Sequence, residues 1–171
     1  MPSNTYVLIA SSTVGAGGAA SINFTSIAST WTDLVLKMSL RNASLDVTGG
    51  GQVFYVRFNS NTSSYSGKYL FGQGSGTPTS ASDLYVLGDP FDATASTFGS
   101  ADVYIPNYAG STNKSYSADS VSENNATRAD AILTAALWSN TAAITSINIT
   151  PAVGGSIAQN STAYLYGIVK S

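Results

Sequence analysis

The sequence predicts an all-β protein: a jelly-roll-like antiparallel β-sandwich that forms a single domain over residues 1–171. Three observations predict this fold. Short segments in which apolar and polar residues alternate recur along the chain, as expected of half-buried strands. Clusters of Gly, Pro, Asn and Ser, which favour turns, separate these segments. The hydrophobic fraction of 43 % and the length of 171 residues are sufficient for one sizeable core.

The strongest predicted strand is 31–40, in which Leu34, Leu36 and Met38 alternate with wetter positions such as Lys37. A slip of one residue would bury Lys37 and Arg41, so the pattern specifies the register of this strand. The last predicted strand, 161–170, alternates in the same way and is the best candidate to lie nearby. We expect both strands in the centre of one β-structure, and the pattern leaves their pairing open.

The remaining elements follow in chain order. Further strands are predicted at 6–10, 21–24, 52–59, 65–72, 83–87, 100–105 and 143–150. Turns or loops are predicted at 15–18, 42–51, 59–64, 73–82 and 151–160. Segment 129–138 is rich in helix formers, but its apolar spacing also fits a strand and its neighbours are strands, so we predict a strand. Residues 1–12 can form an N-terminal arm, and the polar segment 107–125 is expected to be a long surface loop.

The composition restricts the classes of partner. Only 9 % of the residues are charged and the net charge is −2, so no basic face is expected and nucleic acid is not a predicted partner. A surface of Ser, Thr, Asn, Gly and Tyr suits a virion or extracellular setting, or a subunit that covers much of itself with neighbours. The first ten residues lack the charged region of a signal peptide. No apolar run approaches eighteen residues, so no membrane span is expected.

The sequence offers little catalytic chemistry. It contains neither histidine nor cysteine, which excludes disulfides, thiolate metal sites and the common catalytic triads. Asp89 and Asp92 could form a glycosidase pair only across a cleft at a defined separation. A turn-forming Asp before Pro with a solvated second Asp is the simpler interpretation, and a calcium site is the next. We therefore expect no enzyme activity, no cofactor and no metal.

Two further motifs bear on function. Gly72, Gly74 and Gly76 follow a predicted strand, but neither a helix nor a lysine follows them, so we interpret them as a loop rather than a phosphate site. Tyr104 and Tyr108 flank a strand exit, and Tyr116 lies in the long polar segment. Exposed tyrosine beside Asn and Ser suits subunit interfaces and sugar stacking.

Several segments occur in a distinctive order. The chain opens with YVLIAS, followed by SINF, WTDLVL, VRFN, NTSSYS and VYIPNY, and it closes with LWSNTAAITSINI and NSTAYLYGI. This order resembles the small β domain of virion proteins in tailed bacteriophages, including cyanophages, over nearly the whole chain. In that family the domain occurs as a capsid decoration (cement) protein and as the terminal domain of head or tail fibres. The resemblance implies a jelly roll that is commonly trimeric.

The resemblance leads to three functional hypotheses. The first is a non-catalytic cement protein: a homotrimer made in the host cytoplasm that binds the major capsid protein on the outer surface of the assembled head. The second is a fibre tip that binds host-surface glycans, which we rank lower because the sequence shows no fibre shaft or repeats. The third is a polysaccharide depolymerase, against which the absent histidine and the single glutamate count.

Two regions are expected to contact the capsid or other subunits. The arm 4–8 is chosen because a terminal strand can add to the edge of a neighbour's sheet. The segment around 104–114 is chosen because a long polar excursion with tyrosines is otherwise hard to justify in a compact domain. The predicted contact residues are Asn4, Tyr6, Leu8, Tyr104, Asn107, Tyr108, Asn113 and Lys114.

Overall fold

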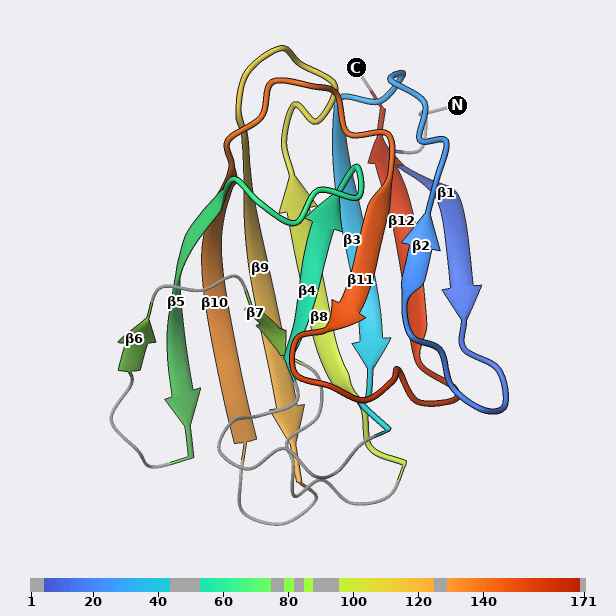
Figure 1. The fold of residues 1–171 in the computed structure, drawn as a ribbon, viewed down its shortest axis with the longest axis vertical. Coiled ribbons are helices and arrows are strands. Elements are labelled where there is room, and N and C mark those ends of the chain that lie inside the picture. Colours follow the sequence, from blue (N-terminus) through green and yellow to red (C-terminus); the bar gives the residue numbers. More distant parts are fainter. Residues whose placement is uncertain are drawn as a thin grey trace.

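A computed structural model describes residues 5–43, 53–74, 79–81, 85–87, 96–124 and 129–169. Within them, twelve strands form two antiparallel sheets and no helix occurs (Figure 1). The larger sheet contains, in spatial order, β1 (Tyr6–Thr13), β12 (Thr162–Ile168), β3 (Asp33–Leu40), β8 (Gly99–Ile105), β9 (Lys114–Glu123), β10 (Ala129–Trp138), β5 (Tyr65–Gln73) and β6 (Thr79–Ala81). The smaller sheet contains β2 (Ile22–Phe24), β11 (Ile147–Pro151), β4 (Val53–Phe58) and β7 (Tyr85–Leu87).

The strand order is that of a jelly roll, as predicted. A jelly roll can be described as one long hairpin rolled up so that its strands pair two by two. The four antiparallel pairs here are β1 with β12, β2 with β11, β3 with β8, and β4 with β7. The chain changes sheet at each of the first three connections, so β1 and β3 lie in the large sheet while β2 and β4 lie in the small one.

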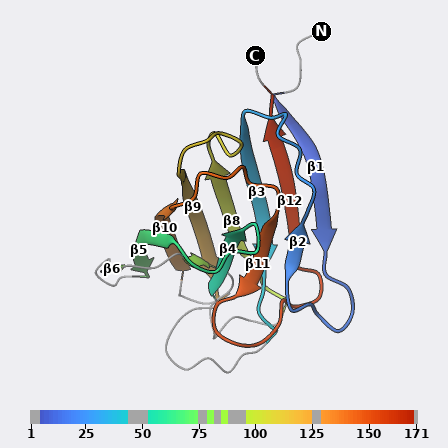
Figure 2. The ribbon, with the colours of Figure 1, turned by 45° about the horizontal axis from the view of Figure 1, so that its top comes forward.

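Two insertions widen the large sheet beyond this eight-strand pattern. Strands β5 and β6 are inserted between β4 and β7, and β9 and β10 are inserted between β8 and β11. The inserted strands join directly, because β10 pairs with both β9 and β5. Figure 2 shows β1 and β12 at one margin of the sandwich and β5 and β6 at the other.

The core lies between the two sheets, where the inward positions of the alternating strands meet. On β3, Leu34, Leu36 and Leu40 are fully buried. On the inner face of the inserted strands, Trp138 and Tyr116 pack edge-on against Phe58 of β4, with ring centroids 5.7 Å and 5.2 Å from it. These aromatic contacts attach the insertion to the small sheet.

The two strands that we expected near each other are neighbours. β12 pairs with β3 over seven residues, and Lys37 of β3 faces solvent as the alternation requires. β3 is an interior strand, whereas only β1 separates β12 from the margin of the sheet. Segment 129–138 is a strand, β10, as predicted.

The expectation of a long surface loop over 107–125 is wrong. Residues 107–113 form a loop, but β9 (Lys114–Glu123) is a ten-residue strand in the interior of the large sheet. The strand was missed because two of its inward positions carry Ser120 and Ser122, so the alternation of β9 is not an alternation of apolar residues. A polar side chain can occupy an inward position when its hydroxyl has an acceptor, and Ser120 Oγ lies 3.3 Å from the Ile132 carbonyl oxygen.

Two other expectations need correction. The proposed arm 1–12 is no free arm from Tyr6 onwards, because β1 pairs with β12 from Tyr6 to Thr13. The predicted loop 73–82 contains the short strand β6. Gly76, Asp89 and Asp92 lie outside the described residues. The predictions of a glycine loop at Gly76 and of a turn at Asp89 and Asp92 therefore stay predictions.

Candidate interaction face

The large sheet has one face packed on the small sheet and one face, here called the outer face, that points away from it. Eight large hydrophobic side chains are exposed, and seven of them lie on strands of this sheet, at positions that point to the outer face. They are Tyr6, Leu8, Leu70, Tyr104, Val121, Leu133 and Tyr164. A sheet face exposed to water alone normally carries polar residues at these positions, so the outer face has the composition of an interaction surface.

The part of the outer face on β1, β12 and β8 is aromatic. Tyr6 and Tyr166 contact each other edge to face, with ring centroids 6.5 Å apart. Tyr166 lies opposite Val35 of β3, and Val35 lies opposite Tyr104 of β8. The register therefore lines up Leu8, Tyr166, Val35 and Tyr104 across four neighbouring strands, and Tyr6 reaches this row diagonally through its contact with Tyr166.

Tyr104 is held in place by a carboxylate. Its hydroxyl donates to Asp33 Oδ2 at 2.8 Å, and the backbone N–H of Asn107 donates to Asp33 Oδ1 at 2.8 Å. The hydrogen bond to Asp33 raises the pKa of Tyr104, with burial adding to the effect. Asp33 thus connects the outer face to the start of the loop that follows β8.

The part of the outer face on β9, β10 and β5 is aliphatic. Leu133 of β10 lies opposite Leu70 of β5, and both side chains are more than half exposed. Val121 of β9 lies opposite Ala131 of β10 and is half exposed. These three large aliphatic side chains have no covering element among the described residues.

A row of charges separates the aromatic and aliphatic parts. Lys37 Nζ donates to Asp102 Oδ2 at 2.6 Å, and this hydrogen bond raises the pKa of Lys37. Asp102 lies directly opposite Asp119 of β9, which in turn lies opposite Leu133. The row therefore contains one cation and two carboxylates.

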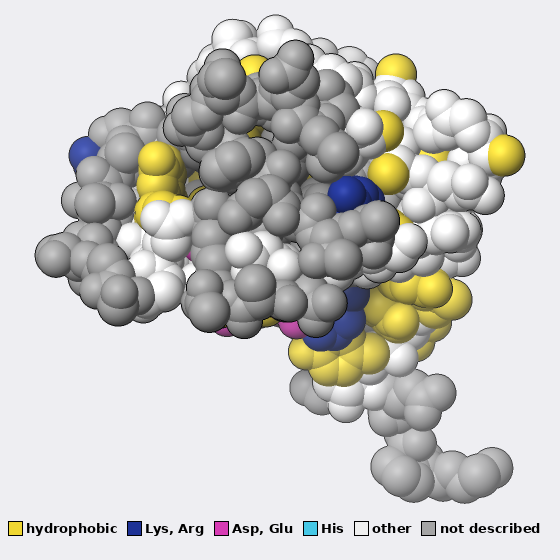
Figure 3. All heavy atoms as spheres, turned by 90° about the horizontal axis from the view of Figure 1, so that it is seen from below, with side chains coloured by type: hydrophobic (Ala, Val, Ile, Leu, Met, Phe, Trp, Pro, Cys, Tyr) yellow, Lys and Arg dark blue, Asp and Glu magenta, His cyan; other side chains and the backbone are white. Residues whose placement is uncertain are grey.

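A hollow of about 350 Å³ lies at this row, between the two parts of the face. Its lining includes Tyr6, Lys37, Tyr104, Asp119 and Leu133. Figure 3 views the molecule from below and shows the outer face edge-on at the lower margin, where hydrophobic side chains lie beside basic and acidic ones. The hollow combines apolar walls with Lys37 and two carboxylates, Asp102 and Asp119, an arrangement that can hold an amphipathic group.

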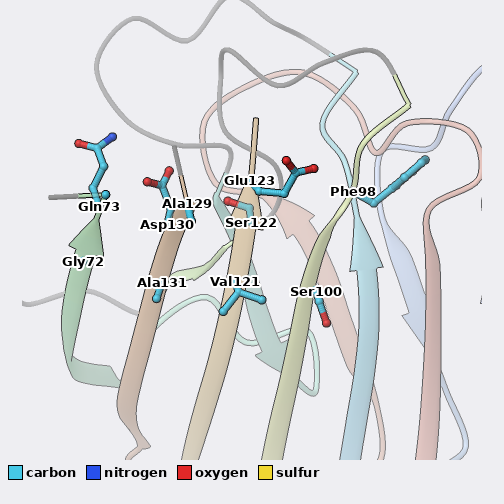
Figure 4. A pocket seen from close by; sticks show the side chains of 11 residues that line it. Gly72, Gln73, Phe98, Ser100, Val121, Ser122, Glu123, Ala129, Asp130 and Ala131 are labelled. Atoms are coloured by element: carbon cyan, nitrogen blue, oxygen red, sulfur yellow. The ribbon is translucent and has the colours of Figure 1, made fainter. Parts of the chain in front are cut away.

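A second hollow, of about 570 Å³, lies at the ends of β5, β10 and β9 that carry Gln73, Ala129 and Glu123 (Figure 4). Asp130 and Ser122 face each other across β10 and β9, and both are buried. Ser122 Oγ has no hydrogen-bond partner among the described residues. Glu123 and Asp130 both line this hollow, Glu123 as an exposed and Asp130 as a buried side chain. In the described ranges no group of three acidic residues could hold a metal ion.

The predicted contact residues are distributed over different environments. Tyr6, Leu8 and Tyr104 lie together on the outer face, and Asn107 and Asn113 are exposed on the loop between β8 and β9. Asn4 lies outside the described residues.

Tyr108 and Lys114 are buried within the chain, so their side chains are not available to a partner. The Tyr108 hydroxyl donates to the Ala28 carbonyl and accepts from the Trp31 N–H at 3.3 Å. Lys114 Nζ donates to the Gly110 carbonyl at 2.7 Å and also to the Thr112 carbonyl, and burial lowers the pKa of Lys114. Both residues were chosen as polar groups of a surface loop, whereas they fasten that loop to the core.

Leu70, Val121 and Leu133 were missed as contact residues by sequence reasoning. Leu70 lies between Tyr69 and Phe71, and Leu133 follows Ile132, so both strands carry apolar residues on two faces. This doubled pattern could have indicated an apolar outer face. Val121 stands alone between two serines and gave no such signal.

Comparisons with known proteins add no identification: no protein-family model, no curated protein and no solved structure matches the chain. Among the described residues, no helix has the length and apolar character needed to cross a bilayer. The geometry of the outer face is therefore the main structural guide to function.

Proposed function

We propose that this protein is a phage capsid decoration (cement) protein that binds the outer surface of the assembled head and stabilises it without catalysis. The observation that carries the proposal is the apolar outer face of the large sheet. The order of sequence segments that resembles virion β domains supports the phage setting. Jelly rolls are common in viral capsid proteins and also in lectins, so the fold is compatible with this function without specifying it.

The outer face has a size suited to stable docking. Seven of its eight strands have seven to ten residues. With strands about 4.8 Å apart and residues about 3.3 Å apart, the face measures roughly 34 Å by 25 Å, on the order of 800 Å². A standard specific interface covers about 800 Å² on each partner.

The mechanism is binding linkage. Internal DNA pressure pushes capsomers apart, and a protein that binds only the assembled lattice stabilises that lattice by mass action. A face dominated by tyrosine and aliphatic side chains should keep its affinity at high salt better than one built from exposed ion pairs. The major capsid protein is the proposed partner.

A homotrimer is the proposed solution state. With 9 % charged residues, the chain has little charge to keep its apolar surface solvated. Light scattering of the purified protein should give three times the chain mass of 17.6 kDa. A monomer both in solution and on the particle would contradict this part of the proposal.

The deciding experiment compares heads that carry the protein with heads from which it has been removed or deleted. Both are heated, and DNA release is followed with an intercalating dye. We expect bare heads to release DNA at a lower temperature, and re-addition of the purified protein to restore the higher one. Equal release temperatures would reject the cement function.

A specific observation favours one alternative function. Tyr6, Tyr104, Tyr164 and Tyr166 gather on one part of the outer face, and tyrosine rings can stack on sugars. A fibre tip that binds host-surface glycans would use this part alone. Binding of the purified protein to host polysaccharide, lost on Tyr104→Ala but retained on Leu133→Ala, would favour this alternative.

A further inference from the structure

Asp119 has an unusual position on the outer face. It lies on β9, which is flanked by three strands on one side and four on the other, so its side chain is central and far from every margin of the sheet. It is exposed, and no described residue donates a hydrogen bond to it or pairs with its charge. Its lateral neighbours are Asp102 on one side and Leu133 on the other.

The charges of this row do not balance within the chain. Lys37 is the nearest cation in the row, and its amine is 2.6 Å from Asp102. Directly opposed residues on neighbouring strands have Cβ atoms about 5 Å apart, and like charges at that distance destabilise a sheet. Water can solvate Asp119 while the face is open. The charge of Asp119 is therefore unfavourable in the folded chain. It would be more unfavourable still if a partner covered it and removed its water, unless a further cation approaches it.

Docking of the outer face would take that water away. A carboxylate that loses its water needs a hydrogen-bonded cation, because an unpaired buried charge is very costly. Lys37 lines the same hollow but already donates to Asp102 at 2.6 Å, and neighbouring Leu133 and Tyr104 carry no positive charge. We propose that the outer face docks onto a protein surface that inserts one lysine or arginine side chain beside Asp119, surrounded by apolar residues. This inference rests on the proposed function, in which the partner belongs to the capsid shell.

The hollow is large enough for such a side chain. Its volume of about 350 Å³ equals that of roughly a dozen liquid waters. Lysine and arginine carry long apolar stems that pack on apolar surface while the head group reaches a polar partner. Leu133 and Tyr104 provide the apolar walls, and Asp119 provides the acceptor.

A second copy of this chain is a poorer occupant of the same face. The proposed homotrimer is cyclic and has no two-fold axis, so the self-contact that competes for this face is a dimer of two outer faces, in which a central residue lies close to its own copy. Asp119 would then face Asp119, and the nearby Lys37 of each copy is already bound to Asp102. Charge complementarity thus favours a different, basic partner.

The test measures binding of the purified protein to heads prepared without it. Asp119→Asn should weaken binding about 30-fold or more, the range seen when one partner of a buried charge pair is removed. Asp119→Lys should abolish binding, and Asp119→Glu should stay within about five-fold of the parent chain. The matched control is Glu123→Gln, an equal charge change at the end of the same strand, which should change affinity less than about three-fold.

The outcomes separate the inference from the proposed function. If the unaltered protein does not bind heads, the proposed function fails and this inference fails with it, before any variant is compared. If it binds and Asp119→Asn binds within three-fold of it, the inference alone is wrong. Light scattering tests whether the outer face binds a second copy of the chain. If Asp119→Asn self-associates more strongly than the parent chain, the outer face is assigned to a second copy and the inference is overturned. Unchanged thermal unfolding of each variant confirms that the fold is intact.

Discussion

Replacing Tyr116 with phenylalanine should make the protein more stable. The Tyr116 side chain is 3 % exposed, and its hydroxyl has no hydrogen-bond partner among the described residues. Burying a hydroxyl without a partner costs about 1–3 kcal/mol relative to leaving it in water. The Tyr116→Phe variant retains the ring that packs edge-on against Phe58 and removes only the unsatisfied group.

The expected gain in the free energy of unfolding is about 1 kcal/mol, at the low end of that range because the denatured chain also loses a hydroxyl that water solvates. For a chain of this size, about 1 kcal/mol corresponds to a rise in Tm of roughly 2–4 °C. Tyr108→Phe is the matched control. Its hydroxyl bonds the Ala28 carbonyl and the Trp31 N–H, so its loss should cost about 1–3 kcal/mol.

Urea unfolding followed by tryptophan fluorescence measures both variants at one protein concentration, because association would make stability depend on concentration. Equal slopes with urea would show that a shift of the midpoint reports stability. A loss of 1 kcal/mol or more in Tyr116→Phe would mean that the hydroxyl has a partner in solution. In that case the reasoning from its burial is wrong.

Three further predictions concern the fold. Gly167→Ala should destabilise the protein by about 1–3 kcal/mol, because its Cβ would lie 2.3 Å from the Trp31 ring, and near-ultraviolet circular dichroism should report a displaced tryptophan. Lys114→Met should cost about 2 kcal/mol in urea unfolding, because it removes a buried ammonium that donates to the Gly110 and Thr112 carbonyls; an unchanged midpoint would contradict this. Burial raises the pKa of Tyr65 to about 12, against about 10 in the unfolded chain. The protonated hydroxyl is therefore favoured in the folded state, and this contribution is complete below pH 10 and is lost as the pH rises from 10 through 12. Urea midpoints at pH 9, 10 and 11 should fall, and Tyr65→Phe should reduce the fall.

The parts of the fold that the sequence predicted are those with apolar alternation. Strand β3 and its register follow from leucines on one face and Lys37 on the other. Strand β10 was identified despite its helix formers, because ten residues of alternation fit the neighbouring strands. Strand β9 was missed, because its inward serines satisfy the geometry of a strand without an apolar signal. The pairing of inserted β10 with β5 joins residues about sixty positions apart, which no local pattern contains.

The sequence likewise predicts only some residues of the outer face, because residue type alone does not give the direction of a side chain. Tyr6, Leu8 and Tyr104 were chosen for their residue types and lie on the outer face. Tyr108 was chosen on the same grounds and is buried, because the direction of a loop side chain depends on contacts with distant Ala28 and Trp31. The central role of Asp119 depends on which strands flank β9, and this information exists only once the sheet is assembled.

The insertions give the outer face much of its distinctive character. A jelly roll of eight strands would end its large sheet at β8, and its outer face would carry only the aromatic part and the Lys37–Asp102 pair. Leu70, Leu133 and Asp119 all come from the inserted strands, contributed by two separate connections of the chain. The core needs only the inner positions of those strands, where Trp138 and its neighbours pack. Apolar residues at the outer positions lower the solubility of an isolated domain and add nothing to its core, so we attribute them to a surface that meets a partner.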